Sequence, residues 1–223
     1  MGLFAIMMKE KLIFIGIKQK TGRGRMDNKQ WEIGIFLFND VEVLDFAGPF
    51  EVFSVTTRED GTKPFSVHTI SENGQMIYAR NGLKVHTDYS FDTMLSFDIL
   101  IIPGGLGARE SEIKKESVIH WISQQMEEVQ FITSVCTGAL LLAKAGLLDG
   151  KKATTHWASL DRLEKEYPEV NVVKNVKFVD EGNVITSGGI SAGINMSFHL
   201  GKRLVGAKLM KETAKRMEYD IPL

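Results

Sequence analysis

The sequence has few of the features that mark secreted, membrane or disulfide-stapled proteins. It contains one cysteine, Cys136, and five prolines among 223 residues. A single cysteine cannot form an internal disulfide, which is typical of a reducing compartment. No apolar run reaches the roughly 18 residues of a membrane span. The early run at residues 12–17 is too short for a secretory core. We therefore expect a cytoplasmic protein with no membrane contact.

The charge is also small, but it is unevenly distributed. The formal net charge is −1, whereas residues 1–25 carry six basic side chains and one acidic one, a net charge of +5, which leaves −6 on the rest. A surface with that excess of negative charge is unsuited to nucleic acid. We predict a flexible N-terminal extension at residues 1–28 and one domain at residues 29–223. The whole chain is 43% hydrophobic, which suffices for one core.

The stretch at residues 131–157, FITSVCTGALLLAKAGLLDGKKATTHW, places Cys136 between two patterns. An apolar run at residues 131–135 predicts a short strand, and residues 137–145 are helix formers closed by Gly146. A strand that turns into a helix at a cysteine is a nucleophile elbow, in which the following N–H groups point at the side chain. Those groups predict a thiol pKa below the free value of about 8.5. The alternative is an unreactive, buried cysteine.

Two other apolar runs end in segments suited to a binding site. Residues 31–38, WEIGIFLF, predict a buried central strand, and Asp45 follows it before a predicted helix at residues 50–60. A lone aspartate there could equally cap the helix. Residues 97–102, FDILII, run into the turn PGGLG at residues 103–107, whose amides could bind an anion. This turn lacks the spacing of a dinucleotide-binding motif, so NAD is not implied.

The rest of the chain alternates strand and helix patterns. Strands are predicted at residues 152–155, 176–179 and 184–187, and helices at residues 111–125, 160–167 and 207–217. A further helix is predicted to follow the segment at residues 187–193 and to run to about residue 205. Residues 65–71 and 83–86 depart from this alternation and predict a small antiparallel excursion. The alternation predicts an α/β fold, a three-layer α/β/α sandwich with a mainly parallel, doubly wound, flavodoxin-like sheet.

These segments resemble a known family. The stretch SVCTGALLLAKAGLLDGKKATTHW resembles the cysteine elbow of the DJ-1/PfpI superfamily, relatives of the class I glutamine amidotransferases. LDFAGPFEVF is similar to its isonitrile hydratase-like branch, and IPGG and SGGISAGIN match other family segments. The resemblance implies that Cys136 is the nucleophile, that Asp45 faces it and that the Thr137 hydroxyl hydrogen-bonds in the site. Glu42 competes with Asp45, because some other branches use a glutamate on this segment.

The resemblance also implies a pocket and partners. The residues expected to line the substrate pocket are Gly104, Gly105, His156, Gly189 and Ser191. Of these, His156 is expected beside the site rather than as the direct partner of the cysteine. The resemblance further implies a small-molecule substrate, a homodimer, and no cofactor or metal.

Three functions remain open for such a protein. The first is an enzyme like isonitrile hydratase, in which the Cys136 thiolate adds to an isonitrile while Asp45 supplies a proton. The second is a glyoxalase or deglycase of the same superfamily. It is disfavoured because the protease-like and some glyoxalase-like members place a histidine directly after the cysteine, where this chain has Thr137. The third is a non-enzymatic redox sensor or stress protein whose Cys136 is oxidised to a sulfinate.

Overall fold

The computed structural model describes residues 29–221, so the predicted extension at residues 1–28 lies outside the described part of the chain. The strands are β1 (Trp31–Phe36), β2 (Phe65–Ser71), β3 (Ile77–Tyr78), β4 (Lys84–Val85), β5 (Tyr89–Ser90), β6 (Ile99–Ile102), β7 (Phe131–Ser134), β8 (Lys152–Ala153), β9 (Asn171–Val172), β10 (Phe178–Asp180) and β11 (Val184–Ser187). The helices are α1 (Val43–Val55), α2 (Leu106–Glu110), α3 (Glu116–Glu128), α4 (Gly138–Lys144), α5 (Leu160–Glu166), α6 (Ala192–Val205) and α7 (Ala207–Arg216). Short 3-10 turns are η2 (Arg80–Gly82), η3 (Glu112–Lys114) and η4 (Trp157–Ser159).

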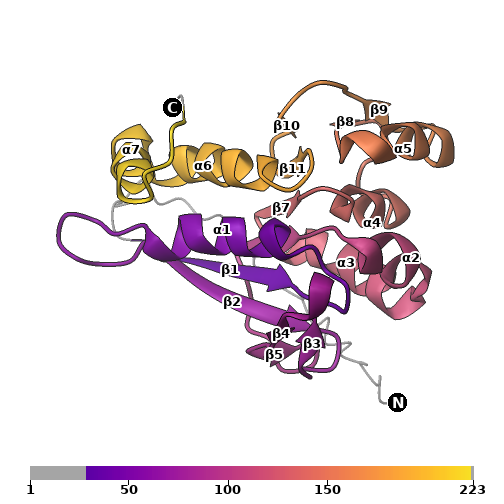
Figure 1. Cartoon of the computed structure of the whole chain (residues 1–223), viewed down its shortest axis with the longest axis horizontal. Helices are drawn as coiled ribbons and strands as arrows, with labels where there is room; N and C mark the ends of the chain where they lie inside the picture. Colours follow the sequence, from indigo (N-terminus) through magenta and orange to yellow (C-terminus); the bar gives the residue numbers. More distant parts are fainter. Residues whose placement is uncertain (1–28, 222–223) are drawn as a thin grey trace, which may run out of the picture.

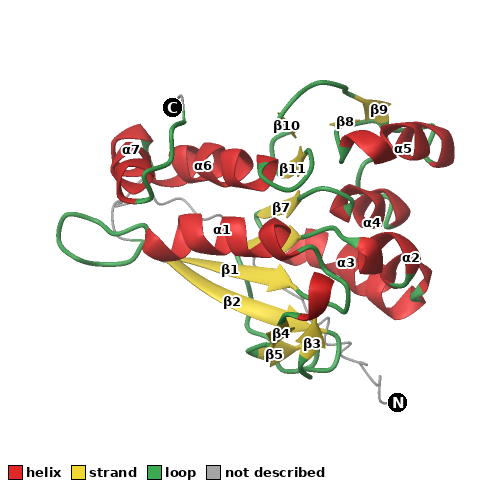
Figure 2. Cartoon of the chain, viewed as in Figure 1, coloured by secondary structure: helices red, strands yellow, loops and turns green. Residues whose placement is uncertain are grey.

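A central sheet organises these elements. Its seven strands follow the order β10-β11-β7-β6-β1-β2-β5. Neighbouring strands are parallel except β10 and β11, which are antiparallel. Helices α1 and α6 pack together on one face, and α3 and α4 pack together on the other (Figures 1 and 2). The predicted three-layer, mainly parallel α/β fold is therefore confirmed.

The core lies where parallel strands are covered on both faces. Strands β6 and β11 are buried along their whole length, and β1 is buried except at Glu32. Strands covered on both faces carry near-continuous apolar runs rather than an alternating pattern, which is why the sequence revealed β1 and β6. Helix α4 is buried from Gly138 to Ala143, so the segment after Cys136 is anchored in the core. Among the helices of residues 29–221, none combines the length and apolarity of a bilayer crossing.

Two element predictions were wrong. Residues 65–71 form β2, a full strand of the central sheet parallel to β1, rather than half of an antiparallel excursion. The alternating pattern of β2 reflects its place beside β5, a two-residue edge strand that pairs only with the end of β2 and leaves residues 66–68 partly buried. Helix α1 begins at Val43 and holds Pro49 in its interior, whereas we expected Pro49 near the first turn. Asp45 therefore lies inside the first turn of α1 rather than before a helix.

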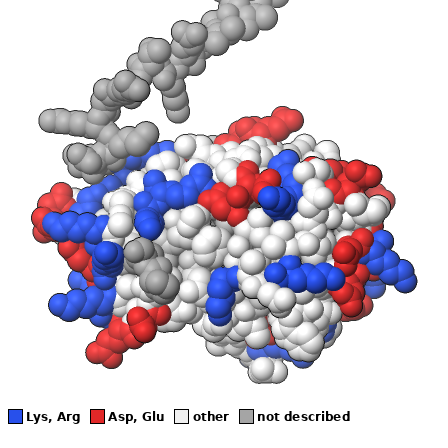
Figure 3. Space-filling model, turned by 90° about the horizontal axis from the view of Figure 1, so that it is seen from above, with Lys and Arg blue, Asp and Glu red and all other residues white. Residues whose placement is uncertain are grey.

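The carboxyl ends of four adjacent strands, β11, β7, β6 and β1, meet at one edge of the sheet. The helices that follow β1 and β6 cover opposite faces, and ligands bind where such a reversal occurs. The β3–β4 hairpin lies against the loop after β1, since the Asp40 N–H donates to the Tyr78 carbonyl at 2.8 Å and the Arg80 N–H to the Val41 carbonyl at 2.8 Å. On the face seen in Figure 3, basic and acidic side chains are interspersed.

Candidate active site

Cys136 lies on a strained turn between β7 and α4. Its φ is 56°, in the left-handed region that side chains other than glycine avoid. Two backbone hydrogen bonds hold it there: its N–H donates to the Gly188 carbonyl at 3.1 Å, and its carbonyl accepts from the Thr155 hydroxyl at 2.7 Å. The side chain is only 6% exposed. This geometry is that of a nucleophile elbow, as the sequence predicts.

Asp45 is wholly buried and reaches the cysteine from the neighbouring element. Its Oδ2 accepts the Gly104 N–H at 3.0 Å. Its Oδ1 is buried without a partner at full hydrogen-bond geometry, although the Cys136 thiol and the Ile190 amide lie close enough to affect the pKa of the carboxyl. Asp45 is also the carboxyl that interacts with the Cys136 thiol, whereas Glu42 acts on Asp45 through its charge. The geometry therefore favours Asp45 over Glu42 as the partner of the sulfur.

The glycine turn after β6 holds the site together instead of offering free amides. The Gly104 N–H is taken up by Asp45, and the Gly105 N–H donates to the Thr137 Oγ1 at 2.9 Å. The Thr137 hydroxyl in turn donates to the Gly105 carbonyl at 3.2 Å. A Cβ on Gly104 would lie 2.4 Å from the Thr137 nitrogen, so only glycine fits there. These two amides position Asp45 and Thr137. Their N–H groups are therefore already occupied and are not available for the anion binding that we expected.

Burial gives the two titrating groups unusual pKa values. Burial is the largest cause that raises the pKa of Asp45, from 3.8 to about 7. Burial, followed by the charge of Asp45, raises the pKa of the Cys136 thiol to about 12. The Thr137 and Ile190 amides lower it, as the elbow predicts, but they do not outweigh burial. The expected lowering of the thiol pKa was therefore wrong in direction.

Ile190 is a second strained residue at the site. Its φ is 53°, an outlier for a β-branched side chain. This conformation aims its N–H toward the Cys136 sulfur and the Asp45 carboxyl, whose pKa values it lowers. The sequence analysis missed Ile190, although the preceding Gly188 and Gly189 marked the turn. Strain at both Cys136 and Ile190 concentrates unusual backbone around one sulfur atom.

The cysteine opens into a small pocket of about 140 Å³. We call it the cysteine pocket. Its lining residues are Glu42, Arg80, Gly105, Leu106, Arg109, Cys136, Thr137, His156 and Ile190. Sequence reasoning missed the two arginines. Arg109 follows the PGG turn closely enough to have been considered, whereas Arg80 reaches the pocket only because the β3–β4 hairpin folds back. Among residues 29–221, no three histidine, cysteine or acidic side chains are grouped to hold a metal ion.

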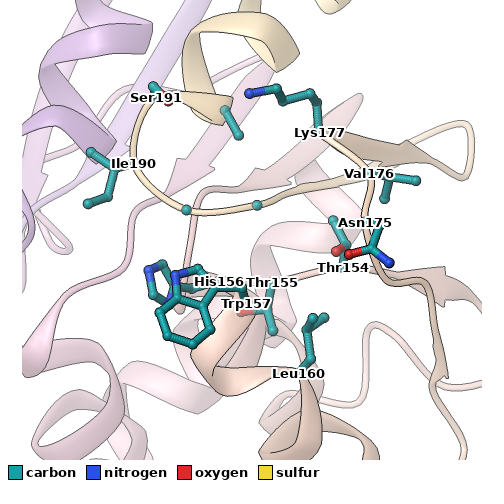
Figure 4. Close-up of a pocket in the computed structure, with 13 residues that line it drawn as sticks. Thr154, Thr155, His156, Trp157, Leu160, Asn175, Val176, Lys177, Ile190 and Ser191 are labelled. Atoms are coloured by element: carbon teal, nitrogen blue, oxygen red, sulfur yellow. The ribbon is translucent and has the colours of Figure 1, made fainter.

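A larger pocket of about 490 Å³ adjoins it, which we call the outer pocket (Figure 4). Its lining residues are Thr154, Thr155, His156, Trp157, Leu160, Asn175, Val176, Lys177 and residues 188–192. His156 and Ile190 line both pockets and form the wall between them. In Figure 4, His156 and Trp157 lie together, opposite the loop that carries Ile190 and Ser191.

The structure divides the expected pocket residues into two groups. Gly105 and His156 line the cysteine pocket, and Gly104 lies buried behind it. Gly189 and Ser191 line only the outer pocket. The His156 ring packs on Gly189, where a Cβ would lie 2.2 Å from His156 Cδ2. The pKa of His156 is lowered by burial and by the charge of Arg109.

Comparison with known proteins decides the family. The model of the DJ-1/PfpI family matches residues 32–203. The chain belongs to the DJ-1/PfpI family. It is 33% identical over 189 residues to the isonitrile hydratase of Pseudomonas putida, covering 84% of this chain and 78% of that protein. The cysteine elbow, the aspartate in α1 and the glycine turn all lie within the residues that the family model matches.

Other members of the DJ-1/PfpI family have different functions. The chain is 27% identical to the HTH-type transcriptional regulator GbdR of Pseudomonas aeruginosa, covering 84% of this chain but only 50% of that protein. In structure, it matches a ThiJ/PfpI family protein from Pseudomonas syringae with a TM-score of 0.77 at 23% identity, covering 87% and 77% of the two chains. It matches Drosophila melanogaster DJ-1beta with a TM-score of 0.74 at 20% identity, covering 86% and 100%. Membership of the family therefore fixes the fold but not the reaction.

Proposed function

We propose that the protein is a cysteine-dependent enzyme that hydrates an isonitrile to an N-substituted formamide. The observation that carries the proposal is the buried pair of Asp45 and Cys136, in which the pKa of the carboxyl is raised to about 7 beside the thiol. The likeness to the Pseudomonas putida isonitrile hydratase supports the choice of reaction. A buried acid beside a nucleophile is what this reaction needs, because the isonitrile carbon must gain both a sulfur and a proton.

The proposed reaction has two stages. First, the Cys136 sulfur bonds to the terminal isonitrile carbon while the thiol proton passes to Asp45. The Asp45 carboxyl then gives that proton to the same carbon, which leaves a thioimidate on the enzyme. In the second stage a water oxygen bonds to this carbon and one water proton goes to the nitrogen. The carbon–sulfur bond then breaks, the sulfur takes up the remaining proton, and the formamide leaves.

The protonation of the pair defines the active form. The two groups titrate as one unit, with pKa values of about 7 and about 12. Between these values the pair holds a single proton, mostly on sulfur, and Asp45 is free to accept it as the sulfur attacks. Below pH 7 the second proton occupies Asp45 and blocks this transfer. The Thr137 and Ile190 amides stabilise the charge on sulfur during the attack.

The other two functions have less support. The residue after Cys136 is Thr137, whose hydroxyl accepts a hydrogen bond from the Gly105 N–H and donates one to the Gly105 carbonyl. This hydroxyl cannot replace a histidine base. The only histidine that lines the cysteine pocket, within residues 29–221, is His156, and its Nδ1 accepts the Ala158 N–H at 3.2 Å. For the redox sensor, Cys136 is only 6% exposed and the pKa of its thiol is raised, whereas oxidation favours an exposed thiolate.

The test is turnover of cyclohexyl isonitrile by the wild type and by Cys136→Ala, with N-cyclohexylformamide measured by NMR. We expect many turnovers by the wild type and only the uncatalysed rate with Cys136→Ala. Circular dichroism and thermal unfolding serve as the control for folding of the variant. Conversion of methylglyoxal but not of the isonitrile would establish the glyoxalase function instead. If neither is converted and mild peroxide yields a Cys136 sulfinate, the protein is a sensor.

A further inference from the structure

The cysteine pocket is lined by two arginines, Arg80 and Arg109, whose side chains have no hydrogen-bond or ion-pair partner within residues 29–221. The arginine ion pairs among residues 29–221 are Arg162 with Glu166 and Arg203 with Asp180. Neither Arg80 nor Arg109 belongs to one. The Arg109 Nε is buried and finds no hydrogen-bond acceptor in the part of the chain that the structure describes. A buried guanidinium N–H without an acceptor is costly, and the cost is removed when a ligand supplies one.

The backbone fixes where both arginines lie. The Arg80 N–H donates to the Val41 carbonyl at 2.8 Å, which holds η2 against the loop that precedes α1. The Arg109 carbonyl accepts from Arg162 at 3.2 Å, which ties α2 to α5. Both guanidinium groups are thus carried by anchored segments rather than by free loops. An arginine on an anchored segment gives up less conformational freedom on binding a carboxylate than one on a free loop.

The charged side chains that line the pocket leave an excess of positive charge. Glu42 is the acidic residue that lines it, against Arg80 and Arg109. His156 lines it as well, and its lowered pKa keeps the ring neutral at pH 7. Asp45 does not line the pocket; it lies behind the sulfur, interacts with the thiol and carries a negative charge above about pH 7. The pocket holds about 140 Å³, so a bound anion lies within a few bonds of the carbon that meets the sulfur.

We propose that Arg109, assisted by Arg80, forms an anion subsite that recognises a carboxylate carried by the substrate close to its reacting carbon. This inference deepens the proposed function and rests on it where it names the substrate, which is a small isonitrile bearing a carboxylate. Arg109 is then a specificity-determining residue. An arginine binds a carboxylate through two parallel N–H donors, so replacement by a neutral amide loses both the charge and the geometry.

The first test measures the subsite without any isonitrile. Cys136 is alkylated at pH 8 with iodoacetate, which is an anion, and with iodoacetamide, which is neutral and nearly the same size. Rates come from intact mass, and the ratio of the two rates is compared with that of 2-mercaptoethanol. We expect the ratio for the protein to exceed the reference by about tenfold, because one charge-assisted hydrogen bond contributes about that factor.

Substitutions test whether the two arginines cause the preference for iodoacetate over iodoacetamide. Arg109→Gln should bring the ratio close to the reference, Arg80→Gln should lower it less, and Arg109→Lys should keep part of it. Glu42→Gln should raise the ratio, since it removes the opposing charge. Lys211→Gln is the matched control, because Lys211 is an exposed cation on α7, at the far end of the molecule from the β3–β4 hairpin (Figure 1). It should leave the ratio unchanged.

The second test uses isocyanoacetate and its methyl ester as substrates. We expect kcat/KM to favour the acid in the wild type, and this preference to disappear in Arg109→Gln. If no isonitrile is converted but the alkylation ratio behaves as above, the proposed function fails and the anion subsite stands for another reaction. If the alkylation ratio equals the reference in the wild type, or is the same in Arg109→Gln, the subsite is refuted even when isonitriles are hydrated.

Discussion

The cysteine pocket and the outer pocket share a wall, yet they differ in almost everything else. The outer pocket, at about 490 Å³, has the size of an ordinary ligand site, and Trp157 on its rim is 78% exposed. The cysteine pocket measures only about 140 Å³. It nevertheless contains the strained Cys136, with the buried Asp45 beside it, and the two unpaired arginines. Volume alone would not select the pocket that we propose as the active site.

The comparison of the two pockets shows where features that destabilise the folded protein are gathered. The cysteine pocket combines left-handed backbone at Cys136 and Ile190 with a buried carboxyl and a buried arginine N–H without a partner. Each of these features destabilises the folded protein by about 1 to 3 kcal/mol. The lining of the outer pocket has the shared Ile190 and Asn175, whose φ is 62°, and asparagine adopts that conformation at less cost than most side chains. Several destabilising features within one small pocket point to the candidate active site better than pocket volume does.

The largest effect that we predict is a difference in activity between substitutions of Asp45 and Glu42, the two acidic residues at the cysteine site. Asp45→Asn should lower kcat for isonitrile hydration by about 10² to 10⁴-fold, because an amide cannot carry the proton from sulfur to carbon. The amide oxygen can still accept the Gly104 N–H, so the fold should persist. Glu42→Gln is the matched control and should keep kcat within a few-fold. An equal loss in both variants would contradict the assignment of Asp45.

Part of this site could be predicted from the sequence. The apolar run before Cys136 and the helix formers after it specify the elbow, and the glycine turn specifies the close approach of β6 to α4. Family resemblance pointed to Asp45. The pKa of the thiol could not be predicted, because burial outweighs the amides and burial is a property of the whole fold. Arg80 could not be placed either, since its position depends on hydrogen bonds from a distant hairpin.

Asp45→Asn should lower activity but raise the stability of the folded protein at high pH. The pKa of Asp45 is raised from 3.8 to about 7, so the folded state binds its proton more tightly than the unfolded chain. This contribution to stability is complete below about pH 4 and is lost as the pH rises through 7. At pH 8 the variant should therefore be more stable than the wild type, by up to a few kcal/mol. Urea denaturation at pH 5 and pH 8 measures the difference in unfolding free energy between the variant and the wild type. If this difference is the same at both pH values, the pKa of Asp45 is not raised in the folded protein.

The shared wall offers a variant that separates the two pockets. Gly189→Ala should displace the His156 ring, since the new Cβ would lie 2.2 Å from Cδ2. We expect a loss of about 1 to 3 kcal/mol in unfolding free energy. We also expect a larger change in KM than in kcat, because Gly189 lines the outer pocket and not the cysteine pocket. Gly188→Ala is the control, since its Cβ would meet its neighbours at an ordinary 3.6 Å. Similar effects of both changes would mean that His156 does not separate the pockets.

The smallest predicted effect concerns strain at the elbow. Cys136→Gly should be more stable than Cys136→Ala by up to about 1 kcal/mol, because glycine adopts a positive φ at little cost. Thermal unfolding of the two inactive variants compares them directly. Ala139→Gly, at an ordinary helical position in α4, should instead lose about 1 kcal/mol or more. If Cys136→Gly is the less stable of the two, the turn is not strained.

The pH dependence of isonitrile hydration tests the central claim most directly, namely that Asp45 and Cys136 share one proton in the active form. We predict that kcat/KM rises about tenfold per pH unit below pH 7 and levels off above an apparent pKa of about 7, the value of Asp45. The residual activity of Asp45→Asn should lack this rise through pH 7. A rate that falls as the pH passes 7, or one that follows the pKa of a free thiol near about 8.5, would contradict the account.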